Sequence, residues 1–137
     1  MELELKHLAP YLPYKLKLQI AGEYIDDNEH EGLRTWRMAG IVDNDILVHK
    51  QGYISNIENE IEDCFPILRP LSDLNKEIQI GEFYTSFRLH LKRIYPSESI
   101  SSNTATWTWR SFEWLLERHF DVFGLIPGGL AIDINTL

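Results

Sequence analysis

Hydrophobic and polar residues alternate through the first half of the chain. Leu16, Leu18 and Ile20 alternate with two lysines and a glutamine in the segment from 14 to 25, and this period of two is typical of a strand with one buried face. Consecutive short strands usually pair with their neighbours in the chain, so the pattern predicts an antiparallel meander of about four strands. The other three predicted strands are separated by polar turns and cover residues 33–42, 46–49 and 53–57.

The second predicted strand carries its large apolar side chains on one face. Trp36, Met38 and Val42 are separated by even numbers of residues, and residues so spaced lie on the same side of a strand. We therefore expect all three side chains to face the core.

The segment that follows the meander has no clear period. Residues 56–63 are acidic and could form a loop or a short helix, whereas two prolines hold residues 64–70 in an extended conformation. Ser72 is then placed to cap one helical turn, with Asp73 near its start.

The second half of the chain shows helical spacing. From residue 82 to 95 apolar side chains recur every three or four positions, and Pro96 ends the pattern, so an amphipathic helix is expected there. Residues 97–106 contain seven Ser, Thr or Asn residues, a composition typical of a mobile loop. A second helix is predicted at 108–120, with a buried stripe formed by Phe112, Leu115, Leu116, His119 and Phe120.

The C-terminal segment is predicted to form a short strand near residues 130–134. Leu130, Ile132 and Ile134 alternate with smaller or polar residues, and we expect all three in the core. Because the helices follow the strands along the chain, they should pack on one face of the sheet. The predicted fold class is therefore α+β, in a single domain spanning residues 1–137.

Charge and composition narrow the classes of partner. Thirteen Lys and Arg against twenty-one Asp and Glu give a net charge of −8, which disfavours binding to a phosphate backbone. No apolar run approaches the roughly 20 residues needed to span a bilayer, and the first residues lack the features of a secretion signal. With a single cysteine, Cys64, no intramolecular disulfide can form. We expect a cytoplasmic protein with no membrane association.

The sequence carries no recognised catalytic, cofactor-binding or metal-binding motif. It contains no GxSxG elbow, Walker loop or GxGxxG, and its five histidines lack the spacing that places two ligands on one helix face. The acidic turn at 26–31 departs from a calcium loop, because Glu31 occupies the position that needs Gly. Cys64 follows Asp63, and a neighbouring carboxylate raises a thiol pKa, so an inert buried thiol is expected. We therefore assign no catalytic, cofactor or metal residue.

Two alternatives for the aromatic and polar residues near the C-terminus stay open. If the chain is a small enzyme or a ligand-binding module, its site would be assembled from separated residues, with His119, Asp121 and Trp107 as candidates. The structural interpretation is a hydrogen-bonded His119 and tryptophans that pack on the core, Trp109 more surely than Trp107. Trp107, Trp109 and the 97–106 loop could instead form a recognition surface.

Charged residues cluster in three places. The predicted helix at 82–95 is basic near its C-terminus, which compensates the helix dipole or offers a small anion-binding patch. Residues 23–31 and 58–63 are acidic without any Lys or Arg, and these two edges could either meet a basic partner or simply be solvated.

Three segments resemble a group of small uncharacterised proteins encoded by phages and prophages of gut anaerobic bacteria. The similar segments are Leu5-Lys-His-Leu-Ala-Pro-Tyr-Leu-Pro-Tyr, Ile67-Leu-Arg-Pro-Leu-Ser-Asp-Leu, and His119-Phe-Asp-Val-Phe-Gly-Leu-Ile with Gly129-Leu-Ala-Ile-Asp-Ile-Asn. The resemblance implies a mobile-element origin in a bacterial cytoplasm and transfers no catalytic residues. It favours a non-enzymatic accessory protein whose partner is another protein.

Overall fold

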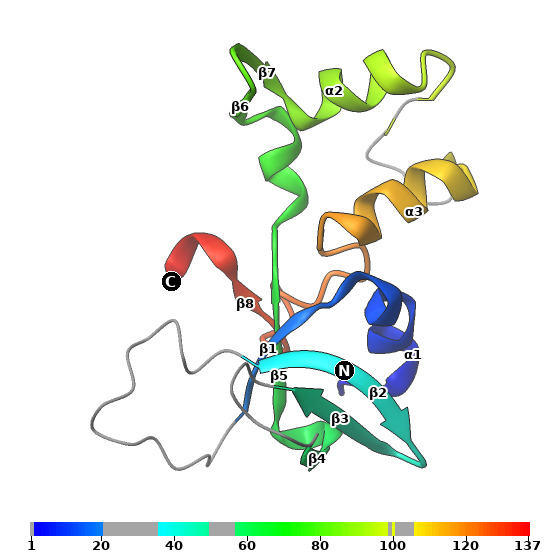
Figure 1. The fold of residues 1–137 in the computed structure, drawn as a ribbon, viewed down its shortest axis with the longest axis vertical. Coiled ribbons are helices and arrows are strands. Elements are labelled where there is room, and N and C mark those ends of the chain that lie inside the picture. The colour runs from blue at the N-terminus through cyan, green and yellow to red at the C-terminus, as the bar shows by residue number, and fades with distance from the viewer. Residues whose placement is uncertain (1, 21–35, 50–56, 99, 101–105) are drawn as a thin grey trace.

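The computed structural model describes residues 2–20, 36–49, 57–98, 100 and 106–137. It confirms the α+β class: helices accompany a mostly antiparallel sheet that includes a C-terminal strand. The sheet lies at one end of the longest axis, and a hairpin followed by a helix lies at the other (Figure 1).

The main sheet has six strands in the order β4-β3-β2-β1-β5-β8. Every pair is antiparallel except the last, in which Ile67 of β5 lies beside Ile132 of β8 in a parallel pair. The strands are β1 (Lys17–Ile20), β2 (Trp36–Val42), β3 (Asp45–His49), β4 (Ile57–Glu60), β5 (Cys64–Leu68) and β8 (Ile132–Asp133). The first four form the predicted meander.

The fourth strand lies later in the chain than predicted. Residues 57–60 form β4, so the expectation of a loop or short helix is wrong for most of the acidic segment and right only for the 3-10 turn Ile61–Asp63. Pairing with β3 explains the difference, because each β4 residue has a partner on that strand. The predicted strand residues 21–25, 33–35 and 53–56, and most of the predicted 97–106 loop, lie outside the described residues.

A β-bulge in β2 changes which side chains face the core. Trp36 and Met38 are buried as predicted, but Val42 is 38% exposed. The register with β3 shifts between Met38 and Gly40, so Ala39 is an extra residue on β2. One extra residue reverses the alternation beyond it, and Ile41 packs against the core in place of Val42.

The helix predicted from residue 82 begins five residues later. Its first part is instead a hairpin, whose strands turn at Gly81, a glycine with a φ of +61°. Ser86 then starts the helix, because its hydroxyl accepts the backbone N–H of Leu89 at 3.2 Å. The elements are β6 (Glu77–Ile80), β7 (Phe83–Ser86) and α2 (Phe87–Ile94).

The remaining helices agree with the predicted pattern only in part: the helix predicted at 108–120 ends at Glu117, and the predicted cap at Ser72 is not formed. The helix predicted at 108–120 is α3 (Trp109–Glu117), capped by the hydroxyl of Thr108. Pro70 rather than Ser72 precedes the 3-10 turn Leu71–Asn75, and no side chain caps it. Near the N-terminus, α1 (Leu5–Leu8) leads into the 3-10 helix Ala9–Tyr14.

The C-terminal strand is shorter and less buried than expected. Leu130 and Ile132 are half-buried, and Ile134 is 37% exposed. β8 ends at Asp133 because the carboxylate of Asp133 accepts the backbone N–H of Asn135 and starts a final 3-10 turn, Ile134–Thr136. The prediction that all three aliphatic side chains lie in the core is therefore wrong.

The sheet and the helices meet where two distant segments cross. Arg69, directly after β5, forms an isolated parallel bridge with Phe120. Its amide donates to the carbonyl of His119 at 2.8 Å, and its own carbonyl accepts from the amide of Asp121 at 2.8 Å. From the N-terminal side, the fully buried Tyr11 donates its hydroxyl to the carbonyl of Phe120.

We predict that Tyr11→Phe lowers the free energy of unfolding by about 1–3 kcal/mol, because the buried carbonyl of Phe120 loses its donor. The hydroxyl also accepts the amide of Val122 at 3.3 Å, so two backbone groups lose a partner. Denaturant titration measures the change. The matched control is Tyr84→Phe, which removes the hydroxyl of a tyrosine that is 67% exposed and should stay within about 0.5 kcal/mol. Equal losses in the two variants would contradict this account of the crossing.

Candidate interaction surface

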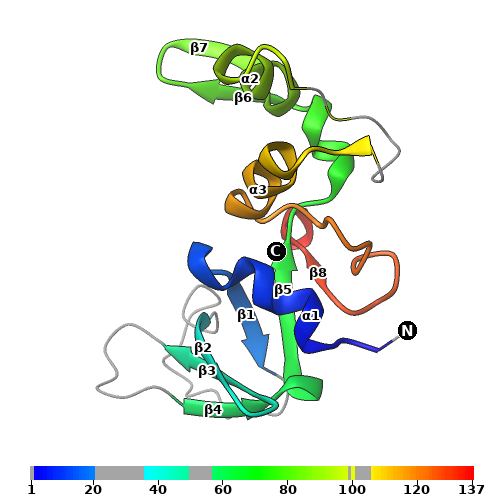
Figure 2. The same cartoon turned by 90° about the vertical axis from the view of Figure 1, so that its right-hand side faces the viewer.

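The β6–β7 hairpin and α2 form an arm at one end of the molecule, defined here as residues 77–94 (Figure 2). Four large apolar side chains of this arm are exposed to solvent: Phe83 at 67%, Tyr84 at 67%, Leu89 at 61% and Ile94 at 44%. Exposed apolar residues that stand singly are common, but several within one short stretch, here divided between β7 and α2, make the arm a candidate interaction site.

The inner face of the arm is packed firmly. The Phe87 ring lies edge-on to the Phe120 ring at 5.2 Å and to the Trp114 ring at 6.2 Å. The guanidinium of Arg69 lies over the Phe87 ring, 5.0 Å from its centroid. Leu91, one turn further along α2, is buried. These contacts hold helix α2 against the rest of the molecule, and Leu89 remains exposed to solvent.

The outer face of α2 is also basic. Residues 76–95 hold four of the thirteen Lys and Arg but only two of the twenty-one Asp and Glu. Arg88 is used locally, since its Nε donates to Asn75 at 2.9 Å and another guanidinium nitrogen donates to the carbonyl of Ile100. Lys92 and Arg93 are exposed beside Leu89, and neither has an ion-pair partner within the part of the chain that the structure describes.

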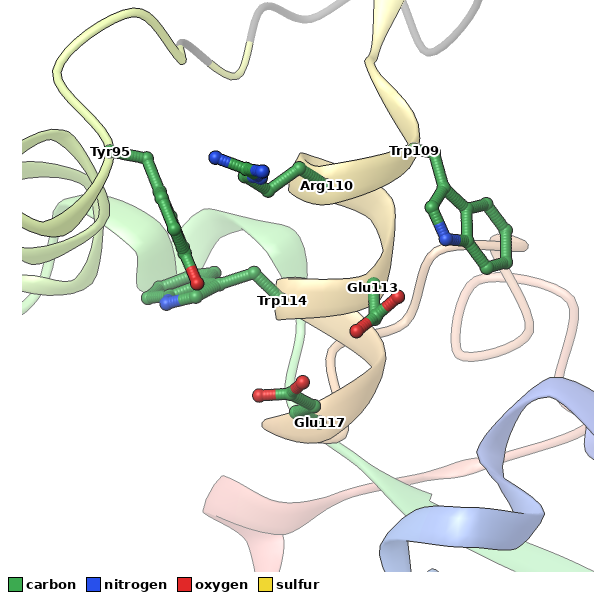
Figure 3. A pocket seen from close by; sticks show the side chains of 6 residues that line it. All are labelled: Tyr95, Trp109, Arg110, Glu113, Trp114 and Glu117. Atoms are coloured by element: carbon green, nitrogen blue, oxygen red, sulfur yellow. The ribbon is translucent and has the colours of Figure 1, made fainter.

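A polar pocket of about 300 Å³ lies between the end of α2 and α3. Figure 3 shows Tyr95 and Arg110 on one side of it, and the Arg110 guanidinium lies over the Tyr95 ring at 4.7 Å from the centroid. Glu117, at the lower rim, accepts from Arg118 at 3.4 Å. Arg110 and Glu117 are engaged with protein neighbours, whereas the buried Nε1 of Trp114, which also lines the pocket, has no hydrogen-bond partner among the described residues.

Of the two tryptophans predicted to pack on the core near the start of α3, only Trp107 does so. Trp109 is 69% exposed, whereas Trp107 is half-buried against the core. A helical side chain covers the turn that precedes it, and Trp109 is the first residue of α3, so no such turn exists for it to cover. Its ring instead stacks on Phe112 at 5.8 Å. The expectation that Trp109 is the surer core residue is wrong.

His119 and Asp121 have structural partners on the backbone. The Nε2 of His119 lies 2.6 Å from the carbonyl of Tyr14, which confirms the structural interpretation of this histidine. The carboxylate of Asp121 accepts the amides of Leu125 at 2.7 Å and Ile126 at 2.8 Å. Asp121 also borders an apolar cavity of about 510 Å³, but both carboxylate oxygens are already occupied by these amides.

Cys64 is the buried thiol that the sequence predicts. Its sulfur donates to the carbonyl of Glu60 at 3.4 Å. Burial, with the nearby carboxylates of Asp63, Asp45 and Glu62, raises the pKa of the Cys64 thiol to about 11. A thiol of this pKa holds little thiolate near neutral pH and is a poor nucleophile.

The described ranges hold no group of metal ligands and no membrane-spanning helix. Within them, no three His, Cys, Asp or Glu side chains are grouped so that they could hold a metal ion. No helix among these residues has the length and apolarity needed to cross a bilayer.

Comparison with known proteins adds no family to this description. The chain matches no protein-family model, no curated protein and no solved structure. The arm is therefore identified from its own geometry. The sequence pattern did not reveal that apolar residues of this segment are exposed. The signal that could have found them was Gly81 between two short runs rich in strand-forming residues.

The position of His119 leads to a prediction about pH. His119 has a left-handed φ of 60°, and burial lowers the pKa of its imidazole below the ordinary value of 6.5 although the Tyr14 carbonyl opposes this shift. The unfolded chain therefore binds the proton more readily, and stability present above about pH 6.5 is lost as the pH falls. His119→Asn tolerates the same backbone conformation but cannot titrate.

We expect the melting temperature to fall less between pH 7.5 and 5.5 in His119→Asn than in the unaltered protein. Thermal unfolding followed by circular dichroism at several pH values measures both curves. Parallel curves would show that His119 does not contribute to the pH dependence.

Proposed function

We propose that this protein is a non-enzymatic accessory protein of a phage or prophage, active in the bacterial cytoplasm, and that it acts by binding another protein through the arm. The observation that carries this proposal is the group of exposed apolar side chains Phe83, Tyr84 and Leu89 on a packed element. The similarity of three segments to phage and prophage proteins supports the proposed origin.

The energetics of the arm favour protein recognition. Fully burying one large apolar side chain stabilises a complex by roughly 1.5–3 kcal/mol, and aromatic residues are enriched at the centres of protein interfaces. Because Phe87 and Leu91 hold α2 against the rest of the molecule, Leu89 on this helix needs little reordering on binding. Preorganisation of this kind reduces the entropic cost of association.

The test compares three tagged baits in the host cell. The unaltered chain should retain the same partner reproducibly, and the double variant Phe83→Ser with Leu89→Ser should lose it, because the apolar contact is removed. Trp109→Ser is the matched control: it removes an aromatic side chain of similar exposure on α3 and should retain the partner. Quantitative mass spectrometry of the bound proteins measures the difference.

Two results would contradict the proposal. One is the absence of any reproducible partner, counting an untagged second copy of this chain as a partner. The other is a partner that the double variant retains as well as the unaltered chain does.

A further inference from the structure

A second surface of the molecule complements the arm in charge. This surface, here called the acidic edge, consists of β4 and the turn after it, residues 57–63. It contains four carboxylates and no Lys or Arg: Glu58, Glu60, Glu62 and Asp63. Glu58 and Glu60 are exposed, and Ile57 beside them is 40% exposed. The acidic edge therefore combines the opposite charge with an apolar side chain.

The acidic edge is also the end of a sheet. β4 is the outermost strand of the six, and among the described residues it pairs only with β3. Backbone N–H and C=O groups along a free edge are suited to accept another chain. The backbone groups of β4, in addition to the negative charge of the acidic edge, therefore favour a contact with another chain.

The arm cannot reach the acidic edge of its own chain. Figures 1 and 2 place the β6–β7 hairpin with α2 and the β4 strand at opposite ends of the longest axis, and the two views agree. A contact between these surfaces must therefore join two different copies.

Contacts between identical surfaces are opposed by charge. In an arm-to-arm contact, the exposed Lys92 and Arg93 of one copy would approach the same cations of the other, and in an edge-to-edge contact Glu58 and Glu60 would approach their equivalents. Like charges brought together at an interface are unfavourable. The combination of arm with edge removes both repulsions and pairs each cation with a carboxylate.

We propose that the partner of the arm is a second copy of this chain, bound head to tail: the outer face of α2 and the hairpin of one copy packs on the acidic edge of the next. This inference rests on the proposed function and names the partner. Lys92 and Arg93 of one copy would face Glu58 and Glu60 of the next. Because the two surfaces differ, the contact repeats from copy to copy and produces open chains or a closed ring.

The first measurement is the mass of the purified full chain in solution as a function of concentration. A monomer has a mass of 16.1 kDa, and light scattering coupled to gel filtration should show larger species as the concentration rises. The arm variant Lys92→Glu with Arg93→Glu and the edge variant Glu58→Lys with Glu60→Lys should each remain monomeric. The control Lys17→Glu with Arg37→Glu changes the net charge as the arm variant does, at exposed positions on the sheet, and should still assemble.

The decisive measurement is a mixture of the two monomeric variants. The arm variant keeps an intact edge and the edge variant keeps an intact arm, so the original contact can form between them. The reversed arm of the first also complements the reversed edge of the second, so the mixture should form species larger than a monomer in which the two variants alternate. One chain that carries all four substitutions should assemble again, because the charges are reversed on both sides.

Each remaining outcome has a definite meaning. If circular dichroism shows that the edge variant does not fold, Glu58→Gln with Glu60→Gln replaces it. This variant should also stay monomeric alone, and its mixture with the arm variant should stop at a dimer, because a neutral edge does not attract the reversed arm. An unaltered chain that stays monomeric at all concentrations overturns the inference, as does a mixture that contains only monomers. A monomer that binds vesicles of anionic lipid through Lys92 and Arg93 also overturns it. A monomer that still captures a different protein through Phe83 and Leu89 overturns the head-to-tail inference while the proposed function stands.

Discussion

The crossing of Arg69 and Phe120 is the contact on which the other parts of the structure depend. Two backbone hydrogen bonds join segments about fifty residues apart in the chain, one leaving the sheet and one leaving α3. Tyr11 adds the N-terminal helices through its bond to Phe120. The sheet, α3 and the N-terminal segment therefore meet at a single buried point, where any backbone group left unpaired would cost free energy.

The way in which α3 ends brings the chain to this crossing. The amides of His119 and Phe120 bond to the carbonyls of Leu116 and Leu115, the pattern of a Schellman motif with His119 in the left-handed position. The chain then turns sharply, so that Phe120 enters the core and its ring meets those of Trp114 and Phe87. Through Phe87 the same point also holds the arm in place. The exposed residues of the arm contribute little to folding, and we propose that they form an interface.

Local patterns in the sequence were sufficient for the meander and for α3. Alternation through Leu16, Leu18 and Ile20 and the stripe at Leu115 and Leu116 depend only on neighbouring residues, and the structure confirms both. The failures arise where distant residues decide. The bulge at Ala39 depends on pairing with β3, and the same dependence made the acidic residues of β4 a strand.

The arm could not be found from periodicity alone. Phe83 and Phe87 fit the spacing of one helix, although the turn at Gly81 and the cap at Ser86 divide them between a hairpin and α2. Exposure is a property of the folded chain, so a helical stripe gives no sign that Phe83 remains in solvent while Phe87 is packed. For the same reason Trp109 was expected in the core. The basic helix and the acidic segment were visible in the sequence, but their placement at opposite ends of the molecule required the fold.

Native-state hydrogen exchange tests the central role of the crossing most directly. The amides of Arg69 and Asp121, which form its two hydrogen bonds, should exchange only when the whole protein unfolds, with the same free energy as global unfolding. Amides of the β6–β7 hairpin, such as those of Ile78 and Thr85, should exchange earlier through local opening, because an isolated hairpin is only marginally stable. If Arg69 and Asp121 exchange as readily as the hairpin while the amide of Leu18 in the sheet stays protected, the crossing does not hold the structure together.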